Sequence, residues 1–158
     1  MTRRSRKVAG VASIISANRK WISKRCEDGK CNVKCHRCDG RTCFFIDCEK
    51  YKADHDIKHK LADCLYLDYR DTCRLAAIEL KGGSLHVRQV IEQIKNCLSL
   101  ADSILWGHEI ANWNGVLLHR GIDPNEFRIL RNSELTFRGK RKLVLVARCG
   151  TDAEVLIT

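Results

Sequence analysis

The sequence predicts an α/β fold, more closely an α+β mixed sheet flanked by helices, and three observations support this class. The chain has 158 residues, of which 44% are hydrophobic, which suits a single domain over residues 1–158 with a substantial core. Two short apolar runs surround a polar turn, as in a β-hairpin. A long helical stretch then alternates with further strand-like runs, which is typical of a mixed sheet with helices packed on it.

The expected hairpin consists of two apolar runs, residues 61–68 and 73–81, joined by the polar turn 69–72. Both runs have the length of ordinary strands, and the residues between them favour a reversal of the chain. Gly82 and Gly83 follow the second run directly, and a glycine pair of this kind marks the exit from a strand.

The later elements follow from periodicity and from turn residues. Apolar residues recur every three or four positions from Val87 to Leu105, which predicts an amphipathic helix with Ser84 as its N-cap. Pro124 suits the first turn of a short helix, and Gly139 suits a turn between two strands. In chain order we expect a helix over 85–104, a strand over 115–119, a helix over 124–132 and strands over 135–138 and 143–149.

The N-terminal third of the chain is strongly basic. The net charge is +10, and residues 1–60 carry 16 Lys and Arg against 7 Asp and Glu, whereas residues 61–158 carry 13 against 12. A localised positive field favours a polyanionic partner such as nucleic acid; the alternative is a solvated face that only aids solubility. The residues expected to contact phosphates are Lys24, Arg25, Lys30, Lys34, Arg37 and Arg41.

Residues 8–25 predict an amphipathic first helix, because Val8, Val11, Ile15 and Ile22 recur at helical spacing. A secretory signal would also begin with basic residues, but this apolar stretch lacks leucine. No apolar run approaches the about 20 residues that cross a bilayer, so no membrane partner is expected.

Ten cysteines are many for this length, and six of them fall within residues 26–48. A cysteine-rich segment beside a good core favours a reducing compartment, here the cytoplasm, and a metal site. Cys26, Cys31, Cys35 and Cys38 would supply four thiolates to one structural Zn²⁺. An iron–sulfur cluster and disulfides without metal remain open alternatives. The cysteines expected as core thiols are Cys64, Cys73 and Cys97.

The hairpin brings acidic residues together if it folds about Asp71. Cross-strand partners then have numbers that sum to 142, so Asp63 lies opposite Glu79 with Cβ atoms about 4.5–5.5 Å apart. The same register places Asp68 opposite Arg74 on the other face, where an acid–base pair supports the alignment.

Two opposed carboxylates destabilise a sheet unless a cation lies between them. The sequence therefore predicts Mg²⁺ or Mn²⁺ bound by Asp63 and Glu79, with waters left for a phosphate substrate. Such an ion polarises a phosphoryl oxygen and activates water. Lys81 shares the face of Glu79 and would stabilise the charge that develops on phosphorus.

The arrangement Asp63, then Glu79-Leu80-Lys81-Gly82, resembles the PD-(D/E)XK nucleases, the restriction-endonuclease-like superfamily. The stretch ADCLYLDYRDTCRLAAIELKGG followed by VRQVIEQIKN is similar to small stand-alone prokaryotic members. The resemblance covers residues 43–149 and implies a nuclease core with residues 26–48 as a cysteine-rich, metal-binding insertion. It further implies that the acids bind Mg²⁺, that Lys81 is catalytic and that Gln93 completes the site. Ala62 stands where the motif has proline.

The expected function is that of a Mg²⁺-dependent endonuclease, an enzyme that hydrolyses phosphodiester bonds of nucleic acid, with DNA favoured over RNA. Prokaryotic defence, mobile-element maintenance and repair are compatible roles. One alternative is a non-catalytic nucleic-acid-binding protein with a zinc-stapled basic arm. The other is a junction resolvase, which would have to be a homodimer.

Overall fold

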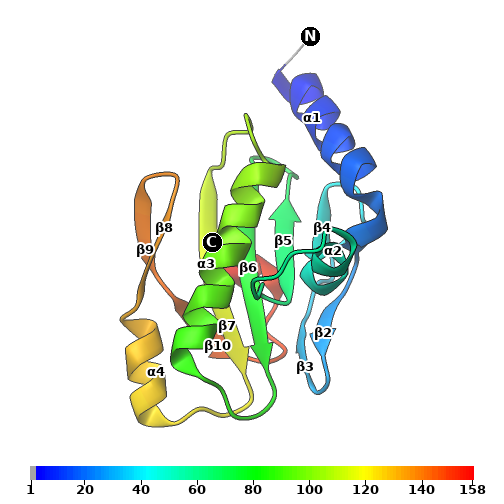
Figure 1. Ribbon diagram of the computed structural model, residues 1–158. Coiled ribbons are helices and arrows are strands. Elements are labelled where there is room, and N and C mark those ends of the chain that lie inside the picture. Colours follow the sequence, from blue (N-terminus) through cyan, green and yellow to red (C-terminus); the bar gives the residue numbers. More distant parts are fainter. Residues whose placement is uncertain (1–2) are drawn as a thin grey trace.

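The computed structural model describes residues 3–158, with side chains described from Gly10 onward. These residues form a six-stranded mixed sheet in the order β1-β4-β5-β6-β7-β10, with helices packed against it (Figure 1). The predicted class, a mixed sheet flanked by helices, is confirmed. The strands of this sheet are β1 (Ile22–Ser23), β4 (Cys43–Asp47), β5 (Cys64–Asp68), β6 (Arg74–Lys81), β7 (Asn112–His119) and β10 (Leu145–Arg148).

Strand direction changes in the middle of the sheet. The pairs β1–β4, β4–β5 and β5–β6 are antiparallel, whereas β7 runs parallel to both β6 and β10. The helix that follows β6 supplies the crossover that a parallel neighbour needs. The C-terminal ends of β6, β7 and β10 therefore meet at one edge of the sheet.

The predicted hairpin register is confirmed in β5 and β6. Leu65 pairs with Ala77 and Leu67 with Leu75, so the partner numbers sum to 142 as expected. Asp68 pairs with Arg74 in the same ladder. The fully buried Asp68 carboxylate receives the guanidinium of Arg70 at 2.6 Å and that of Arg74 at 3.6 Å, so its role is structural, as predicted.

Helix α3 (Val87–Ile104) lies across one face of the sheet (Figure 1). Its N-cap position is held by His86 without a side-chain hydrogen bond, so the predicted cap at Ser84 is wrong. The helix nevertheless buries the apolar stripe that the sequence indicated: Val90, Ile94, Cys97, Leu98 and Ala101. The remaining helices are α1 (Arg3–Asn18), α2 (Cys48–Asp54) and α4 (Pro124–Arg131), with 3₁₀ turns at Arg19–Trp21 and Ala153–Ile157.

The first helix ends earlier than the expected residue 25. It stops at Asn18, whose side chain donates to the Ile14 carbonyl at 2.9 Å. After a 3₁₀ turn over Arg19–Trp21, the chain instead forms β1, in which Ile22 pairs with Ile46 of β4. Sheet pairing thus overrides the helical pattern at Ile22; Val8 of that pattern lies outside the described side chains. Across residues 3–158, no helix is long and apolar enough to span a membrane.

Two small hairpins extend the fold. β8 (Glu134–Phe137) and β9 (Lys140–Leu143) close around Gly139, whose φ of +78° suits glycine. The strand expected over 143–149 is present as β10 (Leu145–Arg148), which joins the main sheet. The partner of β8 is a separate strand, β9, which the sequence did not indicate. The other hairpin is formed by β2 (Cys26–Asp28) and β3 (Cys31–Val33).

The β2–β3 hairpin covers the sheet face opposite α3 and is attached covalently. Cys26 forms a disulfide with Cys64 of β5, and Cys31 forms one with Cys149 after β10. The prediction that Cys64 is a core thiol is therefore wrong, whereas Cys73 and Cys97 are buried free thiols as expected.

Removing the Cys31–Cys149 disulfide should destabilise the fold, because this bond links residues 118 positions apart. Loop-closure entropy predicts a loss of about 3–5 kcal/mol in unfolding free energy for the double variant Cys31→Ala, Cys149→Ala, measured in urea. In excess dithiothreitol the variant and the parent should have the same stability. Equal stability without reductant would show that this bond is not formed.

Gly115 of β7 leaves no room for a side chain. A Cβ built there would lie 2.2 Å from Leu135 Cδ1 and 2.6 Å from Ile94 Cγ2, and both neighbours are fully buried. Gly115→Ala should lower the unfolding free energy by about 1–3 kcal/mol through overpacking. Gly83→Ala, where nothing lies within 4 Å, is the control and should leave it nearly unchanged.

Candidate functional site

The β5–β6 pairing brings the two predicted acidic residues together. Asp63 precedes β5 and Glu79 lies on β6, and their carboxyl groups are close enough to share a hydrogen bond. Asp63 Oδ2 also accepts from the Leu80 backbone N–H at 2.7 Å, which holds this carboxylate at the edge of β6. The site is thus formed by two neighbouring antiparallel strands where β5 begins and β6 ends.

Glu79 is the most deeply buried of the three predicted residues, with 2% of its surface exposed. Burial, followed by the hydrogen bond and the charge of Asp63, raises the pKa of Glu79 to about 9, and Lys81 opposes this only in part. Its Oε2 atom is buried without a hydrogen-bond partner and lies 3.5 Å from Lys81 Nζ. In the absence of a cation, the acid pair therefore retains a proton.

Lys81 ends β6 beside Glu79, with 26% of its side chain exposed. It lies between the buried acid and solvent. The exposed Gly82 and Gly83 follow it, so no bulky side chain covers the strand end. The three predicted residues Asp63, Glu79 and Lys81 thus meet at one place.

Gln93 of α3 lies beside the segment that leads into Asp63. Its side-chain amide donates to the Leu61 carbonyl at 3.2 Å, and its backbone carbonyl accepts from Ala62 at 3.2 Å. These bonds fasten the start of β5 to the helix. Gln93 Oε1 is buried without a hydrogen-bond partner, so the side chain keeps one acceptor for a ligand or a water.

His119 was not among the residues predicted from the sequence. It ends β7 and pairs in register with Lys81 of β6. Only 7% of its surface is exposed, and its Nδ1 atom is buried without a partner. Burial, followed by the charge of Arg148, lowers the pKa of His119. A signal was available, because parallel strands end at the same edge and His119 closes the apolar run after Trp113.

Two hollows border this strand edge. A cleft of about 490 Å³ adjoins His119 on the side of α4 and β10. A cleft of about 500 Å³ adjoins Asp63 on the other side. Apart from Arg25, the charged side chains that line the second cleft are acidic, so a polyanion would meet repulsion there unless cations are present. Those acids are Glu27, Asp28, Asp47, Glu49 and Asp63.

The predicted basic residues of the N-terminal third are all exposed. Lys30 lies in the turn of the β2–β3 hairpin, whose tip is at the same end of the molecule as the end of β6 (Figure 1). Arg25 lines the cleft beside Asp63, whereas Arg37 is paired with Glu154 at 3.3 Å. Arg25 thus shares a cleft with Asp63 of the acid pair.

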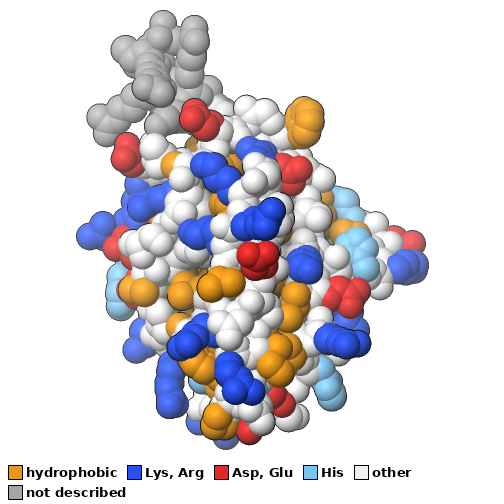
Figure 2. Space-filling view, turned by 90° about the vertical axis from the view of Figure 1, so that its left-hand side faces the viewer, with side chains coloured by type: hydrophobic (Ala, Val, Ile, Leu, Met, Phe, Trp, Pro, Cys, Tyr) orange, Lys and Arg blue, Asp and Glu red, His pale blue; other side chains and the backbone are white. Residues whose placement is uncertain are grey.

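A second basic surface lies in the C-terminal part of the chain, although the charges of residues 61–158 nearly cancel as a whole. Residues 120–148 alone carry eight Lys and Arg against three Asp and Glu. Figure 2 views the side of α4 and the β8–β9 hairpin, where Lys and Arg side chains spread among exposed hydrophobic ones. The exposed basic residues of this segment are Arg120, Arg128, Arg131, Arg138, Lys140, Arg141 and Arg148.

The predicted four-thiolate set is not assembled. Cys26 and Cys31 bond to Cys64 and Cys149, and Cys35 bonds to Cys38. The hairpin geometry is the reason, because Cys31 pairs with Asp28 whereas Cys26, two residues before Asp28, pairs with Val33. Each sulfur atom therefore meets a different part of the sheet. Disulfides are typical of oxidising compartments, which runs against the expected reducing one.

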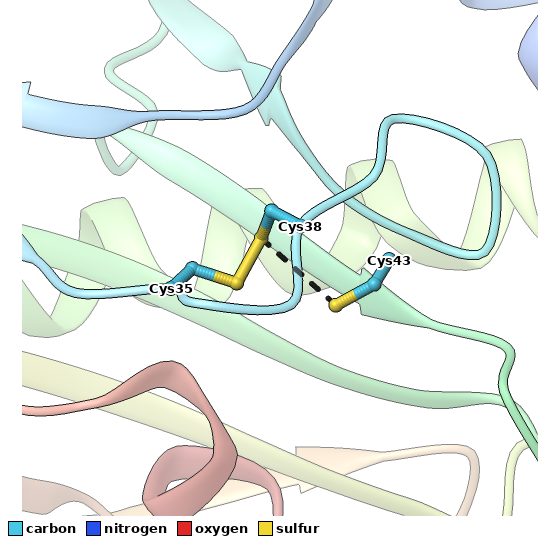
Figure 3. A group of neighbouring side chains, drawn as sticks. All are labelled: Cys35, Cys38 and Cys43. Carbon is cyan, nitrogen blue, oxygen red and sulfur yellow. Dashed lines mark hydrogen bonds between the residues drawn. A yellow bond between two sulfur atoms is a disulfide. The ribbon is translucent and has the colours of Figure 1, made fainter.

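A smaller sulfur cluster forms instead from Cys35, Cys38 and Cys43 (Figure 3). Their sulfur atoms lie within 4.8 Å of one another, so this group could hold a metal ion. Cys43 begins β4 and is a buried free thiol. Its Sγ lies 3.9 Å from Cys38 Sγ and 2.6 Å from the Tyr66 hydroxyl.

In comparisons of sequence and structure, no family model, curated protein or solved structure matches this chain.

The burial of Glu79 beside Asp63 makes metal-free stability depend on pH. Because the pKa of Glu79 rises from 4.5 to about 9 on folding, its contribution to stability is complete below pH 4.5 and is lost as pH rises towards 9. In EDTA, Glu79→Gln should flatten this decline and stabilise the protein at pH 8 by more than about 1 kcal/mol. Thermal unfolding from pH 5 to 9 measures it, with the exposed Glu134→Gln as control.

Proposed function

We propose that this protein is a divalent-metal-dependent nuclease of the PD-(D/E)XK type that hydrolyses phosphodiester bonds of nucleic acid, with DNA as the favoured substrate. The observation that carries the proposal is the meeting of Asp63, Glu79 and Lys81 at one strand end. The mixed sheet flanked by helices has the form that a restriction-endonuclease-like core would take. The resemblance of residues 63–82 to the nuclease motif adds independent support.

The acid pair has the chemistry of a site for Mg²⁺ or Mn²⁺. Two carboxylates in contact, with one buried oxygen unpartnered, match the oxygen ligands that hard divalent cations take. When bound, such an ion polarises the phosphate and supplies an activated water. Asp63 is fixed by the Leu80 amide, so the pair is preorganised rather than flexible.

Lys81 and the basic surfaces would act on the substrate. The Lys81 ammonium borders solvent at the site and would stabilise charge developing on a phosphoryl oxygen. Lys30 and Arg25 on one side, and Arg120 and Arg148 on the other, would hold the backbone phosphates. Contacts of this kind position a duplex without reading its sequence, so weak sequence preference is expected.

Once the Cys35–Cys38 disulfide is reduced, the sulfur cluster would suit a second ion, for which we propose Zn²⁺, because soft thiolates favour it over Mg²⁺. The ligands would be Cys35, Cys38 and Cys43, a set revised from the one that the sequence suggested.

A second function is favoured by one specific observation. Glu79 is only 2% exposed, so its carboxyl group could stay protonated and free of metal, as would suit a protein that binds nucleic acid without cutting it. Such a protein would use the same basic surfaces and leave Glu79 protonated. The two functions differ only in whether the bound strand is cleaved.

Cleavage of plasmid DNA, single-stranded DNA and RNA with added Mg²⁺ or Mn²⁺ tests the proposal. Glu79→Gln and Asp63→Asn should each lower the rate at least about 100-fold, because they remove a metal ligand and its transition-state stabilisation, while Glu134→Gln should match the parent. Gel-shift binding in EDTA should be unchanged in all of them. Binding without any cleavage by the parent protein would establish the second function, and full activity of Glu79→Gln would refute the first.

A further inference from the structure

We infer that the Cys35–Cys38 disulfide closes a redox-gated metal site: when it is reduced, Cys35, Cys38 and Cys43 bind one Zn²⁺ ion. The inference concerns the loop over residues 34–43, not the acid pair, and does not depend on the nuclease proposal.

The positions of the three sulfur atoms fit the ion. In a tetrahedral site with Zn–S bonds of about 2.3 Å, two thiolate sulfurs lie about 3.8 Å apart. Cys38 Sγ and Cys43 Sγ are already 3.9 Å apart (Figure 3), and all three sulfurs fall within 4.8 Å of one another. Only the bonded Cys35–Cys38 pair, at 2.07 Å, must move apart.

The loop that presents the thiols is held in place by its own hydrogen bonds. The Asp39 carboxylate accepts from the backbone N–H groups of Arg41, Thr42 and Cys43, and the Gly40 N–H donates to the Cys43 carbonyl at 3.1 Å. Gly40 has a φ of +75°, a conformation that suits glycine. Cys43 therefore keeps its place beside Cys38 whether or not the disulfide is formed.

The surroundings of Cys43 suit a metal ligand. Its side chain is fully buried, and its Sγ lies beside Cys38 Sγ and the Tyr66 hydroxyl. A coordinated metal deprotonates a thiol outright. The Tyr66 hydroxyl, 2.6 Å from Cys43 Sγ, would then donate a hydrogen bond to the thiolate.

The fourth position would be left to water. His36 lies between the two cysteines in sequence, but its imidazole is 80% exposed and lies 3.7 Å from Asp152. Asp39 is occupied by the backbone amides. Cys35 and Cys38 are partly exposed, so solvent reaches the site on their side.

This disulfide should be the first of the three described ones to open. It joins residues only three positions apart, so it restricts the unfolded chain least, and it is partly exposed. A dithiol reductant would be oxidised to its disulfide while Cys35 and Cys38 each gain a thiol proton. Binding of Zn²⁺ then forms three Zn–S bonds and releases three protons to solvent.

Metal content of the oxidised and the mildly reduced protein tests the inference. After incubation with Zn²⁺ and gel filtration, the reduced protein should carry about one ion per chain more than the oxidised protein. With Co²⁺ in place of Zn²⁺, only the reduced protein should show thiolate-to-cobalt charge-transfer absorption. Equal uptake of Zn²⁺ by the oxidised and the reduced protein would refute the inference that the disulfide controls metal binding.

Three variants separate this site from the other thiols. Cys43→Ser keeps a hydroxyl beside Tyr66 but removes one ligand, so reduced Cys43→Ser should bind Zn²⁺ at least about tenfold more weakly. Cys35→Ser with Cys38→Ser retains the cysteines of the other two disulfides, and after reduction it should take up no more Zn²⁺ than the oxidised parent. Cys73→Ser alters a buried free thiol outside the cluster and should behave as the parent. Unchanged affinity in Cys43→Ser, with its circular dichroism spectrum intact, would refute the proposed ligand set.

Discussion

The pairing register of β5 with β6 is the constraint on which the candidate site depends. Successive side chains of a strand alternate between faces, so a slip by one residue would move Glu79 and Lys81 to the opposite face. The buried pairs Leu65–Ala77 and Leu67–Leu75 oppose such a slip, since it would also remove apolar side chains from the layer under α3. The same apolar ladder thus stabilises the sheet and fixes where the acids meet.

The acid pair and its adjoining cleft form a small acidic region near basic side chains. Glu79 is buried in contact with Asp63, and the cleft beside Asp63 is acidic as well. Arg120 and Arg148 lie where β7 and β10 end at the same strand edge, and both are exposed. Repulsion concentrated at one point favours a cation, and a positive field around it favours a polyanion. The proposed nuclease would use both together.

The cysteines divide between two physical roles. Cys26–Cys64 and Cys31–Cys149 tie a short hairpin, which could bury little surface by itself, to the far face of the sheet. Cys35, Cys38 and Cys43 instead gather at one loop, where the disulfide spans three positions and contributes little to chain entropy. The long-range bonds stabilise the fold, and the short one is free to respond to redox conditions and metal.

The sequence by itself determined the local features, namely the hairpin 61–81 with its register, the helix within 85–104 and the nearness of Asp63 to Glu79, because these depend on alternation and periodicity between close neighbours. Tertiary structure decided what depends on residues far apart in the chain: the end of α1 at Asn18, where Ile22 joins β4, the position of His119 beside Lys81, and the disulfide partners. Cysteine spacing could not reveal those partners, because Cys64 and Cys149 reach the N-terminal segment only when the sheet forms.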